Sequence, residues 1–159
     1  MTAAPKRRSD DEQRFVEDVA ILLEDFRLPR MAGRIVGRLL VAVPADQASD
    51  QLAASLGASK GSISTMTRQL IDLGLVERVG VPGERRDFFR IRRGSWERLI
   101  AARLRGYEEM HLVAERGLRL PVAKDPDVRD RIDGMHLVYE VLAEHVPAML
   151  EELSRRLSR

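Results

Sequence analysis

Residues 46–93 constrain the fold of this chain more than any other segment. They contain two amphipathic helix patterns, at residues 49–56 and 59–73, and a glycine follows each one, Gly57 and Gly74. Glycine readily adopts the left-handed conformation in which many helices end, so we expect both helices to stop at these positions. The result is two helices joined by a link of very few residues, which is typical of a helix-turn-helix.

Two strand patterns follow the second helix. They cover residues 75–79 and 87–92, and a basic turn at residues 82–86, Pro-Gly-Glu-Arg-Arg, separates them. Because side chains alternate between the faces of a strand, we expect Phe89 to point inward and Phe88 outward. Helix, tight turn, helix and two-stranded ribbon is the order of a winged helix-turn-helix, which places its second helix in a major groove and its ribbon on the DNA backbone. The sequence therefore predicts a mostly α fold with a small β-hairpin wing.

The second helix has one apolar and one polar face. Residues at helical spacing are expected to face the core: Ile63, Met66, Leu70 and Leu73. The opposite face is short and nearly free of acid, so it can lie close to DNA; Arg and Gln can read base edges, while Ser and Thr can bond to phosphate or base. The residues predicted to contact DNA are Ser59, Lys60, Ser62, Ser64, Thr65, Arg68 and Gln69 on the helix and Arg85 and Arg86 on the hairpin. Ser49 and Ser59 are also expected to cap the two helices.

These residues resemble a known family. Ser59-Lys-Gly-Ser-Ile-Ser-Thr-Met-Thr-Arg-Gln-Leu-Ile-Asp-Leu-Gly-Leu-Val-Glu-Arg78 resembles the recognition helix and first wing strand of MarR-type regulators. The following Gly83-Glu-Arg-Arg-Asp-Phe-Phe89, with Trp96 soon after, is more similar to the GbsR-like branch. The resemblance implies a homodimer, a pseudo-palindromic double-stranded operator and, in many members, a small-molecule effector. We interpret the chain as a sequence-specific DNA-binding transcriptional regulator that acts as a repressor.

Two other classes of function are open to the same pattern. A winged-helix protein-interaction module would use the polar helix to dock on protein, and would show no salt-dependent affinity for DNA. A ligand-binding or enzymatic helical protein could carry this unit incidentally, and would show turnover or ligand binding without any effect on DNA. The sequence contains no glycine-rich phosphate loop after a strand and no nucleophile elbow, so we expect neither enzymatic activity nor a cofactor.

The composition of the chain narrows the possible functions and locations further. The net charge of +2 is too small to indicate DNA binding by itself, but residues 46–93 hold eight basic and six acidic side chains, so the excess coincides with the predicted reading module. The chain has no cysteine, which excludes disulfides and thiol catalysis. No run is apolar enough to span a membrane, and the basic residues near the N-terminus precede no apolar segment of a signal peptide, so we expect a cytoplasmic protein without a membrane partner.

The remaining residues are predicted to flank the 46–93 module in three parts. Residues 1–11 are a flexible basic arm that either contacts the DNA backbone or a minor groove, or is a solvated tail. Residues 12–45 form N-terminal helices for dimerisation or support, and residues 94–159 form C-terminal dimerisation helices. The helix that begins at Ser95 is expected to continue through Met110.

The N-terminal segment is predicted to hold two helices. The first is expected to begin at Asp10 or Asp11. Its apolar stripe is Phe15, Val19, Leu22, Leu23 and Phe26. In the second helix, which follows Pro29, Gly33 and Gly37 are expected to permit close packing against a neighbouring helix; the alternative is that they only weaken the helix.

Aromatic residues of the flanking helices suggest two interpretations. They line an apolar effector pocket between helices, or they belong to a plain core: Phe15, Phe26, Trp96 and Tyr107.

The last helix carries a heptad-like apolar seam. We expect it to mediate dimerisation, although packing on the chain's own helices is the alternative: Ile132, Met135, Tyr139, Leu142, Val146, Met149 and Leu153.

Two histidine–glutamate pairs have the one-turn spacing that a metal can use, His111 with Glu115 and His136 with Glu140. Two residues make a poor site, so we interpret them as ordinary pairs on a helix surface and expect no metal.

Overall fold

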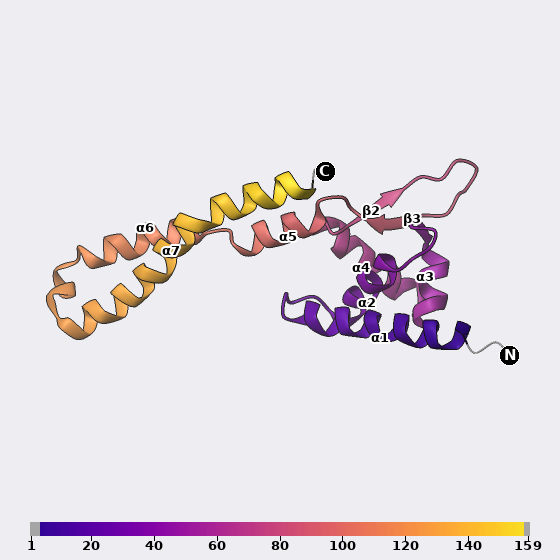
Figure 1. Cartoon of the computed structure of the whole chain (residues 1–159), viewed down its shortest axis with the longest axis horizontal. Helices are drawn as coiled ribbons and strands as arrows, with labels where there is room; N and C mark the ends of the chain where they lie inside the picture. The colour runs from indigo at the N-terminus through magenta and orange to yellow at the C-terminus, as the bar shows by residue number, and fades with distance from the viewer. Residues whose placement is uncertain (1–3, 158–159) are drawn as a thin grey trace. The chain divides into compact units, whose positions relative to one another are not determined.

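The computed structural model describes residues 4–157, which fall into two compact units, one ending at Ser95 and one beginning at Trp96 (Figure 1). The predicted segments 12–45 and 46–93 therefore belong to one unit. Its elements are α1 (Ala4–Glu24), α2 (Arg30–Leu40), β1 (Gln47–Ala48), α3 (Ser49–Leu56), α4 (Lys60–Asp72), β2 (Val76–Val79) and β3 (Phe88–Ile91). The elements that follow are α5 (Ser95–Arg103), α6 (Tyr107–Leu118), the 3-10 turn η1 (Pro121–Lys124) and α7 (Pro126–Leu157).

The first helix begins earlier than the sequence indicated. The backbone is helical from Ala4, so α1 includes most of the segment predicted as a flexible arm, and the predicted start at Asp10 or Asp11 is wrong. Residues 1–3 and the side chains of residues 4–9 lie outside the described part of the structure, and with them the predicted role of the basic arm.

The two N-terminal helices approach each other at glycine. A Cβ atom on Gly33 would lie 2.7 Å from the Cα of Ala20, and one on Gly37 would lie 2.9 Å from the Cα of Val16. Such distances are shorter than van der Waals contact, so α1 and α2 can pack this closely only because α2 has no side chain at either position. The prediction that these glycines permit close packing is confirmed.

This close approach also determines which face of α1 is buried. The buried residues are Val16, Ala20 and Leu23, whereas Phe15 is 41% exposed and Leu22 is 65% exposed. The predicted stripe is correct at Leu23, and its Val19 and Phe26 are half-buried. Its Phe15 and Leu22 lie outside the buried face, because the packing selects the smaller Val16 and Ala20 opposite the glycines. A second apolar face of α1 is not covered by the other described elements of its own unit.

The helix-turn-helix matches the predicted boundaries closely. Helix α3 ends at Gly57 with φ +61°, and α4 is followed by Gly74 with φ +73°, as the glycine signals predicted. Ser59 caps α4, since its Oγ accepts a hydrogen bond from the N–H of Ser62 at 3.1 Å. The predicted cap at Ser49 is wrong: the N-cap residue is Ala48, whose N–H donates to Oε1 of Gln51 at 2.8 Å.

The core of this unit lies where α2, α3 and α4 meet. Ile35, Leu52, Ile63 and Leu70 have no exposed surface. The predicted inward face of α4 is correct at Ile63 and Leu70, but Leu73 is 45% exposed. Thr67 takes a place in the core instead, because its hydroxyl donates to the carbonyl oxygen of Ile63 at 2.8 Å and so has its polar group satisfied.

The wing is a sheet of three strands and not two. Strand β3 lies between β2 and the short β1, which precedes α3, and both pairs are antiparallel. A two-residue strand has no periodicity to detect, so the sequence pattern could not show β1.

The third strand changes the surroundings of the wing phenylalanines. Phe88 pairs with Ala48 of β1 and with Val79 of β2, and the guanidinium carbon of Arg86 lies 5.4 Å from the centre of its ring. Phe88 and Phe89 are both buried, at 8% and 5% exposure, so the predicted outward position of Phe88 is wrong.

The second unit is built around a helical hairpin. The predicted single helix from Ser95 to Met110 is wrong, since α5 ends at Arg103 and Gly106, with φ +89°, precedes α6. Helix α6 packs on α7 after the turn at η1. A Cβ on Gly117 of α6 would lie 3.1 Å from Cγ2 of Ile132, so the first part of the predicted seam on α7 contacts the chain's own α6.

Candidate nucleic-acid interface

Helix α4 presents a continuous polar surface to solvent. Lys60, Ser64, Thr65 and Arg68 are exposed. Ser62 and Gln69 are half-buried at the edges of the same surface. We call the set Lys60, Ser62, Ser64, Thr65, Arg68 and Gln69 the reading face. All of these predicted contact residues therefore lie on one side of a helix whose other side is fixed in the core.

The two charged residues of the reading face, Lys60 and Arg68, are both positive. The first turn of α4 holds no acidic residue, and the helix has a single one, Asp72, at its last position. The positive end of the helix dipole adds to the charge of Lys60 at the same end. The surface can therefore approach a polyanion without an opposing carboxylate along its first three turns.

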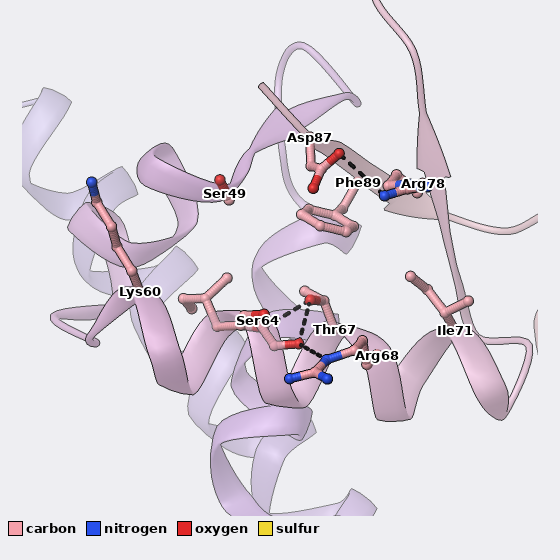
Figure 2. A pocket seen from close by; sticks show the side chains of 10 residues that line it. Ser49, Lys60, Ser64, Thr67, Arg68, Ile71, Arg78, Asp87 and Phe89 are labelled. Carbon is pink, nitrogen blue, oxygen red and sulfur yellow. Dashed lines mark hydrogen bonds and ion pairs between the residues drawn. The ribbon is translucent and has the colours of Figure 1, made fainter. Parts of the chain in front are cut away.

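A groove of about 750 Å³ lies between α4 and the wing sheet (Figure 2). Lys60, Ser64 and Arg68 contribute its α4 side, and Phe89 lies on the strand side. The Nε of Arg68 donates to the carbonyl oxygen of Ser64 at 3.3 Å, so the guanidinium lies back along its own helix at the groove. This hydrogen bond is long and exposed, so the side chain can extend toward a ligand at little cost.

The two predicted wing arginines have different surroundings. Arg86 donates to both oxygens of Glu84 at 3.1 Å and to Oδ2 of Asp50 at 3.1 Å, so it joins the wing to α3. Hydrogen bonds to Glu84 and Asp50 raise the pKa of Arg86, and the bond from Arg86 lowers the pKa of Asp50. Arg85 is exposed, and within residues 4–157 no hydrogen bond or ion pair is found for it.

Other arginines of the ribbon are paired as well. Arg90 donates from Nε to Oε1 of Glu77 at 2.6 Å, which raises the pKa of Arg90. Arg78 lies 3.4 Å from Asp87 at the rim of the groove. The sequence could not show which wing arginine would remain without a partner, because Glu84 is a local partner but the others lie on a neighbouring strand or on α3. The hydrogen bond between Arg86 and Asp50 joins residues 36 positions apart, so no local sequence pattern predicts it.

The other predicted site residues are divided between the two units. Phe15 and Phe26 lie in the first, and Trp96 and Tyr107 lie in the second. The pocket that they were predicted to line stays a prediction.

The seam of α7 is covered unevenly within the second unit. Val146 is buried, and Met149 is 42% exposed. The rest of the seam is half-buried: Ile132, Met135, Tyr139, Leu142 and Leu153. Its role in dimerisation stays a prediction. Across the described residues, no helix combines the length and the apolar character that crossing a bilayer requires.

The architecture and the basic α4 surface define a winged helix-turn-helix protein. Comparison with known proteins specifies the class. Residues 94–156 match the family model described as MmpR5-like MarR family transcriptional regulator. The HTH-type transcriptional regulator MmpR5 of Mycobacterium tuberculosis is 36% identical over 146 residues, which cover 92% of this chain and 88% of that protein. A crystal structure of a transcriptional regulator is also 36% identical, with a TM-score of 0.66, and the match covers 91% of this chain and 99% of that one.

The chain belongs to the MmpR5-like MarR family of transcriptional regulators. It is therefore a DNA-binding transcriptional regulator, and the MarR resemblance of residues 59–78 is confirmed.

Proposed function

We propose that this regulator is a homodimeric repressor that reads a pseudo-palindromic operator with the reading face of α4. The observation that carries the proposal is the acid-free, exposed surface of α4 beside an open groove. Arg68 and Gln69 have the geometry to pair with guanine and adenine edges, and Ser64 and Thr65 can bond to bases or phosphates. Arg85 supplies the wing contact with the DNA backbone.

Uncovered apolar surface supports a dimer. On α1, Phe15, Ile21 and Leu22 are 41%, 49% and 65% exposed, and on the hairpin Leu137 and Val138 are 60% and 57% exposed. Rows of large apolar side chains on helices are stabilised when another surface covers them, and a second copy of the chain is the simplest cover. Two copies would place their α4 helices in successive major grooves about 34 Å apart.

Control by a small molecule would act through this spacing. An effector that changes the arrangement of the dimerising helices would change the distance between the two α4 helices without covering the reading face. We also propose that the protein belongs to the GbsR-like branch, on the basis of residues 83–89. We further propose that it acts in the cytoplasm, where bacterial DNA lies.

Binding to a random duplex library, followed by sequencing of the retained DNA, tests the proposal. We expect an inverted repeat with half-sites about one helical turn apart, and two chains per bound duplex by light scattering. Salt-independent binding, or no enrichment of any sequence, would instead favour the protein-interaction module. Transcription in vitro from a template carrying the selected site distinguishes repression from activation.

A further inference from the structure

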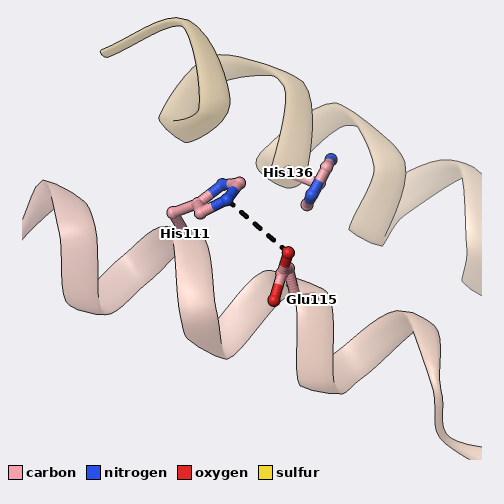
Figure 3. Close-up of side chains that lie close together, drawn as sticks. All are labelled: His111, Glu115 and His136. Carbon is pink, nitrogen blue, oxygen red and sulfur yellow. Dashed lines mark ion pairs between the residues drawn. The ribbon is translucent and has the colours of Figure 1, made fainter. Parts of the chain in front are cut away.

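The hairpin of α6 and α7 brings together three metal-ligating side chains that are distant in sequence (Figure 3). His111 and Glu115 lie one turn apart on α6, and His136 faces them from α7. One ligand atom from each residue lies within 4.8 Å of the other two. The two imidazole rings are 5.0 Å apart between centres, and Nε2 of His111 is 3.7 Å from Oε1 of Glu115.

This cluster is not joined by ordinary hydrogen bonds. The 3.7 Å separation of His111 and Glu115 is longer than a hydrogen bond. The Nδ1 atom of His111 is buried and has no partner among the residues that the structure describes. Neither ring nitrogen of His111 is therefore engaged by a hydrogen bond among the described residues, which is unusual for a sheltered imidazole and leaves either nitrogen available to coordinate an ion.

The chemistry of the donors selects the class of ligand. Two imidazole nitrogens and one carboxylate oxygen suit borderline divalent ions such as zinc, whereas magnesium and calcium prefer oxygen ligands alone. Around a tetrahedral zinc ion, ligand atoms lie roughly 3.4 Å apart, which follows from bonds of about 2.0–2.1 Å. The 3.7 Å between Nε2 of His111 and Oε1 of Glu115 is close to that value. The ligand atoms of all three residues lie within 4.8 Å of one another, and side-chain rotation can shorten the longer of these distances.

A fourth residue, Glu140, lies where it can orient the imidazole of His136. Oε2 of Glu140 lies 3.9 Å from Nδ1 of His136, one turn along α7. Carboxylates beside metal-bound imidazoles commonly accept the second ring N–H and so fix the ring for coordination through its other nitrogen. Glu140 would thus be a positioning residue and not a ligand.

We propose that His111, Glu115 and His136 bind one zinc-class divalent ion between α6 and α7, with the fourth coordination position open to water. The ion links two helices across the turn at η1 and so stabilises the hairpin. The side chains of His111, Glu115 and His136 are 22%, 38% and 22% exposed, so the site is sheltered and still accessible from solvent. This proposal is independent of how the protein contacts DNA.

The test uses the full chain without an affinity tag, stripped of metal with a chelator. Titration with Zn²⁺ by calorimetry should give one site per chain, and Co²⁺ should give the intense visible absorption of a four-coordinate ion. The melting temperature should rise by on the order of 5 °C when Zn²⁺ is present at about 100 times its Kd. No binding of either ion would overturn the proposal.

Variants identify the ligands. His111→Gln and His136→Gln should each weaken Zn²⁺ binding by more than roughly 100-fold, and Glu140→Gln by about 10–100-fold as expected for an orienting partner. His145→Gln is the matched control, because His145 lies on the same α7 and its side chain is 69% exposed. Its Nδ1 contacts the carbonyl oxygen of Val141 and, at 3.9 Å, Glu144. It should bind as the wild type does.

Glu115→Gln keeps the shape of the side chain and removes its charge, so it tests the site even if a histidine variant fails to keep its helix content by circular dichroism. Weaker Zn²⁺ binding by Glu115→Gln supports the proposal. Equal losses in the His145 variant and in the His111 or His136 variant would show unspecific binding to surface histidines and overturn it.

Discussion

The adjacent wing arginines Arg85 and Arg86 should respond differently to replacement by alanine. Both carry a formal positive charge at the tip of the hairpin, but Arg86 is neutralised by Glu84 and Asp50, whereas Arg85 has no such partner among the described residues. Arg85→Ala should therefore remove a phosphate contact. Arg86→Ala should release two carboxylates and loosen the tie between the wing and α3, with little change in the number of phosphates neutralised.

The expected size follows from counterion release. Each phosphate contact contributes about 0.9 to the slope of log K against log [salt], so loss of Arg85 from both chains of a dimer should reduce the slope by about 1.8. Between 50 and 200 mM salt this corresponds to a change of roughly 12-fold in the ratio of wild-type to variant affinity. The variant is thus most impaired at low salt and approaches the wild type at high salt.

Fluorescence anisotropy with one labelled duplex, measured at five or more salt concentrations, provides both slopes. Equal slopes for the wild type and Arg85→Ala, or a slope that falls as much in Arg86→Ala as in Arg85→Ala, would refute the assignment of the wing contact to Arg85.

Four further substitutions, one of them a control, test other parts of the structure. Arg68→Ala should cost about 1–3 kcal/mol on the preferred duplex and relax the preference at one base position, which competition with single-base variants of the duplex would show. Gly37→Ala should destabilise the fold by roughly 1–3 kcal/mol in urea, because its Cβ would meet the α1 backbone, whereas Gly134→Ala, which has open space in α7, should be neutral or stabilise by up to about 1 kcal/mol. Burial opposes the charge of Glu17, but hydrogen bonds and charges from Arg30 and Arg34 outweigh it and lower its pKa below 4.5. A lowered pKa stabilises the fold above the unfolded value, so Glu17→Gln should be less stable than the wild type at pH 7, with a difference that fades as pH falls through 4.5 and below.

The elements of the winged helix could be predicted because their signals are local. Gly57 and Gly74 end helices by their own backbone preference, and Ser59 caps α4 through a hydrogen bond three residues away. The spacing of Ile63 and Leu70 placed the polar side of α4 in solvent. These features depend on residues within one or two turns of each other, which a sequence pattern contains.

What the sequence could not show depends on distant partners. Phe88 pairs with Ala48 of β1, and Asp50 of helix α3 neutralises Arg86 in the wing turn. The buried face of α1 is chosen by the glycines of α2, and His136 joins the pair on α6 only through the fold of the hairpin. In each case the local pattern was compatible with two outcomes, and a tertiary contact decided between them.

The reading face of α4 is tested most directly by the ratio of affinities for a selected operator and for a scrambled duplex of equal length. The wild type should show a ratio of at least roughly 10³, as specific regulators do. Combined replacement of Thr65, Arg68 and Gln69 by Ala should reduce the ratio by 100-fold or more, with nearly the same affinity for the scrambled duplex. An unchanged ratio in that variant would contradict the assignment of sequence reading to α4.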